Sequence, residues 1–413
     1  MNILITGAQF WNKGAQSLLF SLITEIKHKY REKKIVFYYV PVDDILNYDV
    51  EKYRFRFVYD DCFGKDCADI LRKGHRTVKG IGKILKMRPK LKNRTILRLS
   101  KCWGKMNLHL DISGYSLASK WAPEINNRLL RYINGSVKRN IPVILLPQSF
   151  GPFDFKKSAD IWDRKISSTL KKADVICARE IDGKNILSDK YKINKNVYVY
   201  PDLVLSSGEA DPRFIFRKEY KPEEYKLKTR DNVGIIPNYQ LLADNDEKTI
   251  LELYKKVVLS LINKKKNVYV FRHSNDLELC RRICSYINDS RVKLICDDFD
   301  CFEFNSFVKQ FDYVIASRFH SIVHAYKNTV PAVIIGWSVK YMELAERFGQ
   351  EDYVIDVNEH VSDEKLIQAL DKMSESFIDE KTKIGVTLEN IYLNSCYEKV
   401  WPYIDDFFLD IRE

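Results

Sequence analysis

The residues best suited to chemistry lie close together near position 320. The apolar run Val314–Ala316 is typical of a buried strand, and Ser317 could cap a helix that follows it. Arg318 and His320 would then lie in the first turn of that helix. Free backbone N–H groups and the helix dipole attract anions there, arginine binds phosphate or carboxylate, and histidine transfers protons near neutral pH. The pattern predicts a site for a small phosphorylated or carboxylated molecule, although a helix-capping ion network would use the same residues.

Two further cations fit the same chemistry. Lys340 follows Trp337 at the expected start of another helix, where it could contact an anion or remain on the surface. Arg179 follows the strand-like run Val175–Cys177, but its neighbour Glu180 could neutralise it. We therefore expect Arg318 to be the main anion contact, with Lys340 and Arg179 in secondary roles.

Asn12 and Gly14 are expected to open a helix directly after the first strand. A glycine at this place would let a ligand approach the backbone closely, although an ordinary strand-to-helix turn would have the same sequence. The glycine spacing from Gly7 to Gly14 does not match the dinucleotide fingerprint. This argues against NAD as a cofactor.

No metal centre is predicted. His320 and His324 are spaced like two ligands on one helix face, but no neighbouring acid completes the set, so His324 is expected to pack behind the site or orient His320.

The nine cysteines include no Cys-x-x-Cys pair, and no apolar run is long enough to span a membrane. Because the sequence begins with a strand-like segment instead of a charged leader, we expect reduced thiols and a cytoplasmic location.

Short apolar strands alternate with helix-length segments in both halves of the 413 residues. This predicts an α/β fold with two doubly wound, Rossmann-like domains facing across a cleft. The expected parts are an N-terminal domain over 1–205, a C-terminal domain over 231–375 and a helical segment over 376–413 that packs back across the domains. The expected strands are Ile3–Thr6, Ile35–Val40, Leu108–Ile112, Val143–Leu146 and Val175–Cys177, then Val233–Ile236, Val268–Phe271, Val292–Ile295, Tyr313–Ala316 and Ala332–Ile335.

The net charge of +12 is concentrated in one insertion of the N-terminal domain. Thirteen lysines and arginines and no acid lie between Arg72 and Lys105, interleaved with isoleucine, leucine and methionine. A solvated loop is the simplest interpretation, and the segment lacks the aromatic platforms that nucleic-acid binding would need. Basic and apolar residues together favour docking on an anionic membrane surface.

Several motifs give the chain a resemblance to a known family. Ser317-Arg318-Phe319-His320, with Pro331 and Lys340 downstream, resembles the C-terminal signature of the polysaccharide pyruvyl transferases. Weaker matches occur in the expected order: Asn12-Lys13-Gly14-Ala15, Leu146–Phe153, Ala178-Arg179-Glu180 and Pro201-Asp202. Two positions depart from the family pattern, since the opening loop often has Asp where Ala15 stands, and Ser113–Ser116 is a shortened glycine-rich stretch. The resemblance covers roughly residues 1 to 350.

The resemblance implies a GT-B-like fold and transfer of pyruvate from phosphoenolpyruvate to two hydroxyls of a sugar, giving a cyclic ketal and phosphate. Phosphoenolpyruvate would be a co-substrate, with no cofactor. Arg318 and His320 would be catalytic, and the donor would also contact Phe319, Lys340 and Arg179. Asn12 and Gly14 would face the cleft. The acceptor would be a glycan of a cell-surface or exopolysaccharide precursor, which a lipid carrier at the membrane could present.

Two other functions use the same sequence features. A nucleotide-sugar glycosyltransferase of GT-B fold would also place a basic helix terminus in a cleft between two α/β domains. A non-enzymatic protein that binds membrane or nucleic acid through the basic insertion belongs to another class. The first would bind a nucleotide sugar in place of phosphoenolpyruvate, and the second would not need His320.

Overall fold

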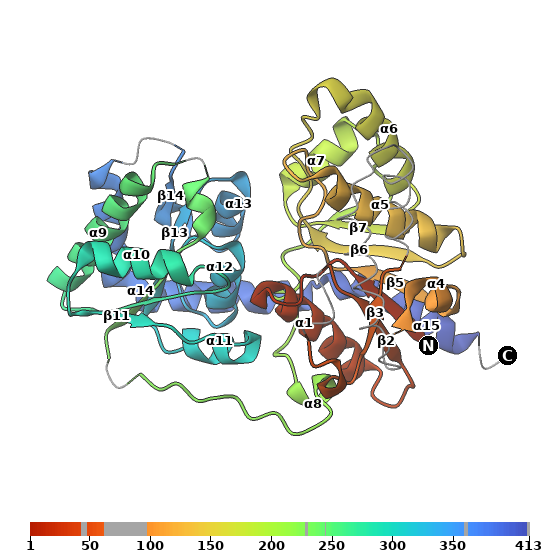
Figure 1. The fold of residues 1–413 in the computed structure, drawn as a ribbon, viewed down its shortest axis with the longest axis horizontal. Coiled ribbons are helices and arrows are strands. Elements are labelled where there is room, and N and C mark those ends of the chain that lie inside the picture. Colours follow the sequence, from red (N-terminus) through yellow and green to blue (C-terminus); the bar gives the residue numbers. More distant parts are fainter. Residues whose placement is uncertain (43–47, 62–96, 228–229, 244, 359–361, 411–413) are drawn as a thin grey trace, which may run out of the picture.

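The computed structural model describes residues 1–42, 48–61, 97–227, 230–243, 245–358 and 362–410 of the chain. These residues form two α/β domains that lie side by side, joined by the segment after residue 206 and by a long helix near the C-terminus (Figure 1). The predicted fold class is confirmed, with two sheets of parallel strands flanked by helices.

The N-terminal domain is built on one parallel sheet. Within the described residues its strands have the order β4-β3-β2-β1-β5-β6-β7-β8. They are β1 (Asn2–Thr6), β2 (Val36–Val40), β3 (Arg56–Tyr59), β4 (Leu97–Arg98), β5 (Leu108–Asp111), β6 (Val143–Gln148), β7 (Val175–Ala178) and β8 (Val197–Val199). The central strands are almost continuously apolar because helices cover both faces of the sheet. The helices are α1 (Lys13–Lys29), α4 (Leu99–Cys102), α5 (Pro123–Val137), α6 (Ala159–Leu170), α7 (Ile181–Asp189) and α8 (Pro212–Ile215).

The C-terminal domain repeats this architecture with a smaller parallel sheet, in the order β11-β10-β9-β12-β13-β14. Its strands are β9 (Asn232–Ile236), β10 (Asn267–Phe271), β11 (Val292–Ile295), β12 (Tyr313–Ala316), β13 (Ala332–Gly336) and β14 (Val354–Asp356). Its helices are α9 (Glu247–Asn263), α10 (Leu277–Ile287), α11 (Cys301–Val308), α12 (Phe319–Lys327), α13 (Val339–Arg347) and α14 (Asp363–Leu393).

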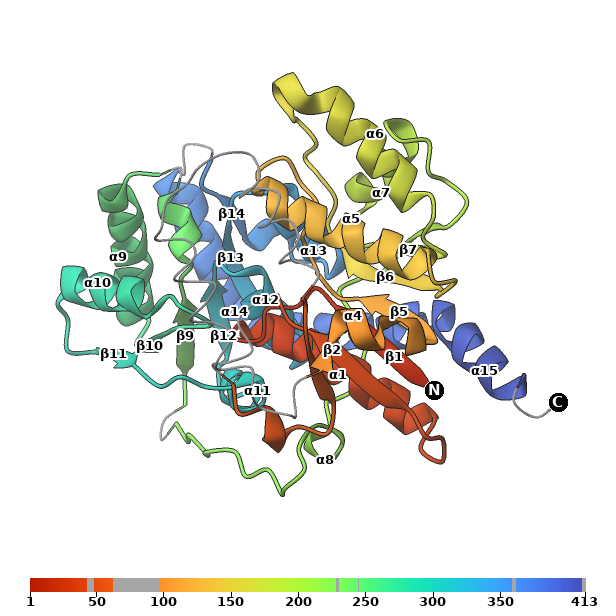
Figure 2. The same cartoon turned by 45° about the vertical axis from the view of Figure 1, so that its right-hand side comes forward.

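Strand order reverses once in each sheet, between β1 and β5 in the first and between β9 and β12 in the second. In open parallel sheets the loops after the strands diverge at such a switch point and leave a crevice for ligands. The predicted site residues lie in these loops, since Asn12 follows β1 and Arg318 follows β12. Helices α1 and α12, which follow these two loops, contact each other, so both switch points lie where the domains meet (Figure 2).

The chain returns to the first domain at its C-terminus. Helix α14 is continuous over 31 residues, so the boundary expected at residue 375 falls inside a helix and does not separate two structural units. After it, α15 (Trp401–Leu409) packs on α1, where the Tyr30 hydroxyl donates to Asp405 Oδ1 over 2.8 Å. Within the described ranges, none of the helices combines the length and the apolar composition needed to cross a bilayer.

Most of the basic insertion predicted to bind a membrane, 72–96, lies outside the described residues. Its last part, 97–105, belongs to the domain: β4 pairs with β3, and the side chains of Leu99, Cys102 and Trp103 are buried. Leu99 was expected to alternate with the basic residues on a membrane-binding face. It packs into the protein core instead, because β4 and α4 close one edge of the first sheet.

The packing of α15 predicts a stability difference between two substitutions on one helix. Ile404 is fully buried, whereas Leu409 is 58% exposed. We expect Ile404→Ala to lower the free energy of unfolding by about 2–5 kcal/mol, because it leaves a cavity in the core. The matched control Leu409→Ala should change it by less than about 0.5 kcal/mol. Urea unfolding of both variants measures this, and equal effects would show that α15 does not pack as described.

Candidate active site

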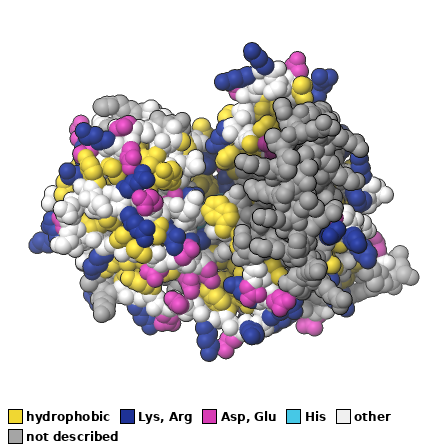
Figure 3. All heavy atoms as spheres, viewed as in Figure 1, with side chains coloured by type: hydrophobic (Ala, Val, Ile, Leu, Met, Phe, Trp, Pro, Cys, Tyr) yellow, Lys and Arg dark blue, Asp and Glu magenta, His cyan; other side chains and the backbone are white. Residues whose placement is uncertain are grey.

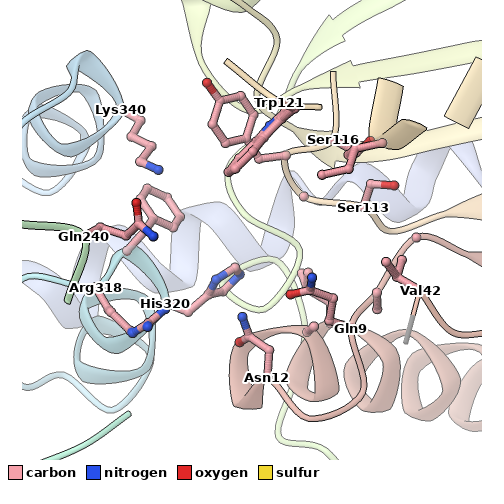
Figure 4. Close-up of a pocket in the computed structure, with 18 of the residues that line it drawn as sticks. Gln9, Asn12, Val42, Ser113, Ser116, Trp121, Gln240, Arg318, His320 and Lys340 are labelled. Atoms are coloured by element: carbon pink, nitrogen blue, oxygen red, sulfur yellow. The ribbon is translucent and has the colours of Figure 1, made fainter. Parts of the chain in front are cut away.

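A cavity of about 420 Å³ lies between the two domains and is lined by all the predicted site residues except Gly14. The surface is notched where the domains meet (Figure 3). Figure 4 shows the C-terminal domain contributing Gln240, Arg318, His320 and Lys340 to one side of this cavity. The N-terminal domain contributes the other side, with Gln9, Asn12, Ser113, Ser116 and Trp121. A ligand in this cavity would contact both domains.

Helix α12 begins one residue later than the sequence suggested. Arg318 occupies the N-cap position, and no side chain caps the helix. The expected cap, Ser317, is buried and hydrogen-bonds the Tyr254 hydroxyl over 2.7 Å, so its side chain points into the core. The uncapped end leaves the first N–H groups of α12 available to an anion in the cavity.

Arg318 is held in place by a buried acid that the sequence analysis did not identify. Its Nη2 donates to Asp276 Oδ1 over 2.8 Å, and its Nε donates to the other oxygen of the same carboxylate. Nη2 also donates to Asn275 Oδ1 over 2.9 Å. The edge of the guanidinium formed by Nε and Nη2 is therefore already bound by Asp276 and Asn275. A bound anion would meet Nη1, so Arg318 offers less of its guanidinium than the sequence suggested.

His320 lies deep in the cavity, with one ring nitrogen turned toward Asp202. Its Nε2 is enclosed without a hydrogen-bond partner, and Asp202 Oδ2 is 3.6 Å away. Burial lowers the pKa of His320 to about 4; Asp202 opposes this shift, while Arg179, Lys340 and Arg318 add to it. The imidazole is therefore neutral at pH 7 in the free protein, and a neutral imidazole can accept a proton.

Lys340 reaches the cavity from the first turn of α13. Its Nζ lies 5.2 Å from the ring centre of Tyr115 in the other domain and 5.6 Å from that of Phe319. Within the described part of the chain it forms no ion pair. Burial, with the charges of Arg179 and Lys120, lowers the pKa of Lys340 to about 7. An ammonium group in this position gains from a bound anion, which would restore its charge.

Arg179 is buried, and its guanidinium donates hydrogen bonds to three side chains of the protein. Its guanidinium donates to Glu180 Oε1 over 2.9 Å, to Asp202 Oδ2 over 3.0 Å and to Ser149 Oγ over 2.6 Å. Its central carbon lies 4.0 Å from the ring centre of Phe319, a cation–π contact. Arg179 thus lines the cavity mainly as a fixed positive charge, and the ring of Phe319 packs against its guanidinium.

Asn12 and Gly14 have more specific roles than a ligand-binding loop. Asn12 caps α1 by accepting the Gly14 N–H over 3.0 Å. A Cβ on Gly14 would lie 2.3 Å from His320 Cγ. The glycine is therefore needed for the close approach of His320. The ligand contact expected at this backbone position is replaced by a contact between the domains.

Several cavity residues were not predicted. His273 and Asn275 follow β10, and the unpartnered Nε2 of His273 is buried beside the cavity. Tyr115 and Trp121 form an aromatic wall on the N-terminal side, with ring centres 5.3 Å apart. The run of polar residues after the apolar strand of β10 was a usable signal for the first pair, because strand ends of one sheet face the same edge. No comparable signal marks Trp121.

The second histidine of α12 lies behind the site. His324 Nε2 is 2.9 Å from the Ser17 hydroxyl on α1, and burial lowers the pKa of His324 to about 3. Among the described residues, no group of three or more histidines, cysteines or acids is arranged to hold a metal ion.

The fold resembles those of several solved enzymes. A putative UDP-N-acetylglucosamine 2-epimerase from Listeria monocytogenes has a TM-score of 0.54 at 10% identity, with 93% of this chain and 90% of that chain covered. A glycosyltransferase from Rickettsia africae has a TM-score of 0.54 at 14% identity, covering 98% of both chains. A trehalose-phosphate synthase from Burkholderia vietnamiensis has a TM-score of 0.53 at 9% identity, covering 100% of both. These similarities define a two-domain protein of GT-B architecture.

Comparison of the sequence with models of protein families identifies the family. The family model for polysaccharide pyruvyl transferases matches residues 12–339, so the chain belongs to the polysaccharide pyruvyl transferase family. No curated protein matches the chain. The match extends through the N-terminal domain into the C-terminal domain as far as β13. It includes every cavity residue named above except Gln9 and Lys340, which lie just outside its limits.

The close contact at Gly14 predicts the effect of a single methyl group. In Gly14→Ala the new Cβ and His320 Cγ cannot both keep their positions, so we expect the imidazole to be displaced from α1. A crystal structure of the variant, after circular dichroism confirms folding, measures the displacement. Gly104→Ala is the matched control, because nothing lies within 4 Å of its Cβ. An unmoved imidazole in Gly14→Ala would contradict the packing described here.

Proposed function

We propose that the protein transfers the pyruvyl group of phosphoenolpyruvate to two hydroxyls of one sugar in a cell-surface or exopolysaccharide precursor. The products would be a pyruvate ketal and inorganic phosphate, and no metal or other cofactor would be needed. One observation carries the proposal: a neutral imidazole lies beside Arg318, Lys340 and an uncapped helix terminus in a cavity between the domains. Membership of the pyruvyl transferase family supports it.

The charges of the site suit a small donor with several negative charges. Phosphoenolpyruvate carries a phosphate and a carboxylate, and the cavity offers Arg318 Nη1, Lys340 and the end of α12. Arg179 adds positive charge, and its Nε, Nη1 and Nη2 each already donate to a residue of the N-terminal domain. No carboxylate among the described residues lines the cavity, since the nearby acids Glu180, Asp202 and Asp276 lie behind the arginines.

The proposed reaction needs proton transfers at several atoms. Protonation of the methylene carbon of the donor makes the adjacent carbon electrophilic, and a sugar hydroxyl attacks that carbon and loses its proton. The carbon–oxygen bond to phosphate then breaks, with the electron pair leaving on the phosphate. The second hydroxyl attacks the same carbon and loses its proton, closing the ketal ring. One proton enters the methyl group, one leaves with phosphate, and two come from the hydroxyls, so the sum balances.

His320 is proposed to accept the proton of an attacking hydroxyl and to pass it to the departing phosphate. Its neutral state in the free protein suits the first step, and a proton taken up there makes it an acid for the second. Arg318 and Lys340 would stabilise the charge that collects on phosphate. The acceptor sugar would lie toward the N-terminal wall, where Tyr115 and Trp121 offer aromatic faces.

The partners of the reaction follow from the same proposal. The acceptor glycan could be presented on a lipid carrier at an anionic membrane surface, as the basic insertion suggested. The family match and the absence of nucleic-acid motifs favour this glycan over a nucleic acid as the partner.

Two substitutions should separate proton transfer from donor binding. We expect His320→Gln to lower turnover roughly 10²- to 10⁴-fold with little change in KM for phosphoenolpyruvate, because a proton-transfer group is lost. Arg318→Lys should chiefly raise that KM, because lysine cannot keep the Asp276 contacts and also reach the donor. Release of phosphate from phosphoenolpyruvate, with a panel of glycan acceptors, measures both.

The exposed His28 supplies the control, since His28→Gln removes an imidazole that is remote from the cavity and should leave activity unchanged. Phosphoenolpyruvate should also raise the melting temperature, whereas a UDP-sugar should not. Stabilisation by a UDP-sugar alone, with normal phosphate release by folded His320→Gln, would contradict the proposed function and favour a glycosyltransferase.

Lys340 should make donor binding depend on pH. Its pKa of about 7 means that much of the free protein carries a neutral lysine above pH 7. A bound anion favours the ammonium form, so binding at pH 8 should take up a proton. Affinity should then fall as pH rises above 7, by at most about tenfold per pH unit for one linked proton.

Calorimetry at pH 8 in two buffers of different ionisation enthalpy measures the proton uptake. Lys340→Met, which keeps the length of the side chain but not its charge, should bind phosphoenolpyruvate more weakly and without this uptake. An unchanged proton count in the variant would exclude Lys340 as the group that titrates.

A further inference from the structure

Asp202 is a buried carboxylate whose two oxygens are both fixed. It follows β8 in a loop of the N-terminal domain and is 1% exposed. Its Oδ1 accepts the Val204 N–H over 3.0 Å, and its Oδ2 accepts from Arg179 Nη1 over 3.0 Å. The orientation of this carboxylate is therefore set by the N-terminal domain before any ligand binds.

The same Oδ2 faces the imidazole of His320, which belongs to the other domain. The distance of 3.6 Å to Nε2 is slightly too long for a hydrogen bond, and Nε2 is enclosed with no other partner. Hydrogen bonds in unliganded active sites are often long and shorten when substrate binds. Gly14 packs against the opposite edge of the ring, near Cγ and Nδ1. The ring is thus held with Nε2 toward Asp202. Nδ1 lies at the edge beside Gly14 but is not enclosed as Nε2 is, so it is the nitrogen left for a substrate.

We propose that Asp202 is a positioning residue for His320: its carboxylate selects the imidazole tautomer with the proton on Nε2, so that the Nδ1 lone pair faces the acceptor hydroxyl. This inference rests on the proposed function. Nδ1 would take the proton of the attacking hydroxyl while Nε2–H points at Asp202, and the imidazolium would return the Nδ1 proton to the departing phosphate. Asp202 stays ionised throughout, as expected for a carboxylate that orients a histidine.

Asp202 differs from the other charged groups around the His320 imidazole, because it alone of the groups named for His320 favours the charged ring. Arg179 and Lys340 face His320 from the two domains, Arg318 lies on its own helix, and all three disfavour a charged imidazole. His324, one turn further along α12, and His273 after β10 also lie near His320, but burial lowers the pKa of both, so they are neutral at pH 7. Asp202 acts in the opposite direction. It is therefore suited to stabilise the imidazolium during the reaction.

The pairing is assembled across the domain interface. Asp202 and Gly14 belong to the N-terminal domain and His320 to the C-terminal domain, so the tautomer would be fixed only while the two domains are closed together. The short motif Pro201-Asp202 does not indicate a function in the sequence. The proposed role of Asp202 follows from its contact with His320 in the other domain.

Nuclear magnetic resonance of protein labelled with ¹⁵N-histidine tests the tautomer directly. The His320 signals can be assigned by their loss in His320→Gln. We expect wild-type protein at pH 7 to carry the His320 proton on Nε2. In Asp202→Asn the amide can donate to Nε2, so the proton should move to Nδ1. A wild-type proton on Nδ1 overturns the proposal. The measurement on wild-type protein does not depend on whether any variant folds.

Glu180→Gln is the matched control. Glu180 is the other acid on Arg179, so both substitutions remove one carboxylate from the same guanidinium, but only Asp202 faces His320. Glu180→Gln should keep the proton on Nε2. A tautomer that is unchanged in folded Asp202→Asn, or that changes equally in Glu180→Gln, overturns the proposal.

Kinetics test whether the tautomer matters. With saturating phosphoenolpyruvate, Asp202→Asn should release phosphate roughly 10- to 100-fold more slowly than wild type. A changed tautomer with unchanged turnover would overturn the positioning role. If wild-type protein releases no phosphate with any acceptor, the proposed function fails, while the tautomer measurement still decides whether Asp202 orients His320.

Discussion

The packing of His320 against Gly14 is the constraint on which the rest of the site depends. Only a residue without a Cβ allows the imidazole of one domain to touch the first turn of α1 in the other. Two neighbouring contacts follow the same helix: Lys13 Nζ bonds Asp298 Oδ1 over 2.9 Å, and Ser17 bonds His324 over 2.9 Å. Together they set the relative position of the domains at the cavity. The distance from His320 to Asp202 follows from that position.

The positive charge of the cavity is supported by a second layer of buried acids. Asp276 holds Arg318, while Glu180 and Asp202 hold Arg179, so the arginines are oriented before a ligand arrives. Buried ions need such partners, because an unpaired charge in a low-dielectric site is costly. Lys340 has aromatic rings around it instead of an acid, which explains why its pKa falls so far while Arg179 remains charged.

Apolar strands and their spacing predict most of this fold. Every strand expected from the sequence is present within a residue or two. The helix that Asn12 and Gly14 were expected to open begins at Lys13, with Asn12 as its cap. Short or edge elements such as β3 and β14 were missed, because a few residues at a sheet edge carry little periodic signal. The end of the C-terminal domain was misplaced, because nothing in local sequence marks where the long amphipathic helix α14 leaves one domain for the other.

The site was predictable in its residue types but not in its contacts. Strand ends and helix starts point to Arg318, His320 and Lys340, since these positions follow from local pattern alone. The partners of those residues come from elsewhere: Asp276 is 42 positions from Arg318, and Asp202 is more than 100 positions from His320. Such pairs depend on how two sheets face each other, and one sequence does not encode that in any short pattern. The roles of Gly14 and Ser317 were misjudged for the same reason.

Apolar packing holds the two domains together. One hydrophobic cluster includes buried residues of both domains, and Phe20 of α1 stacks on Phe302 of α11 with ring centres 5.5 Å apart. This packing holds the cations of the cavity near one another. Burial and their mutual repulsion keep His320 neutral and bring the pKa of Lys340 close to 7. A trianionic donor would reverse the electrostatic part of this balance: Lys340 would gain its charge, and His320 would become a stronger base for the proton of the attacking hydroxyl. Under the proposed function, donor binding and proton transfer would therefore be coupled, because the same cations act on both.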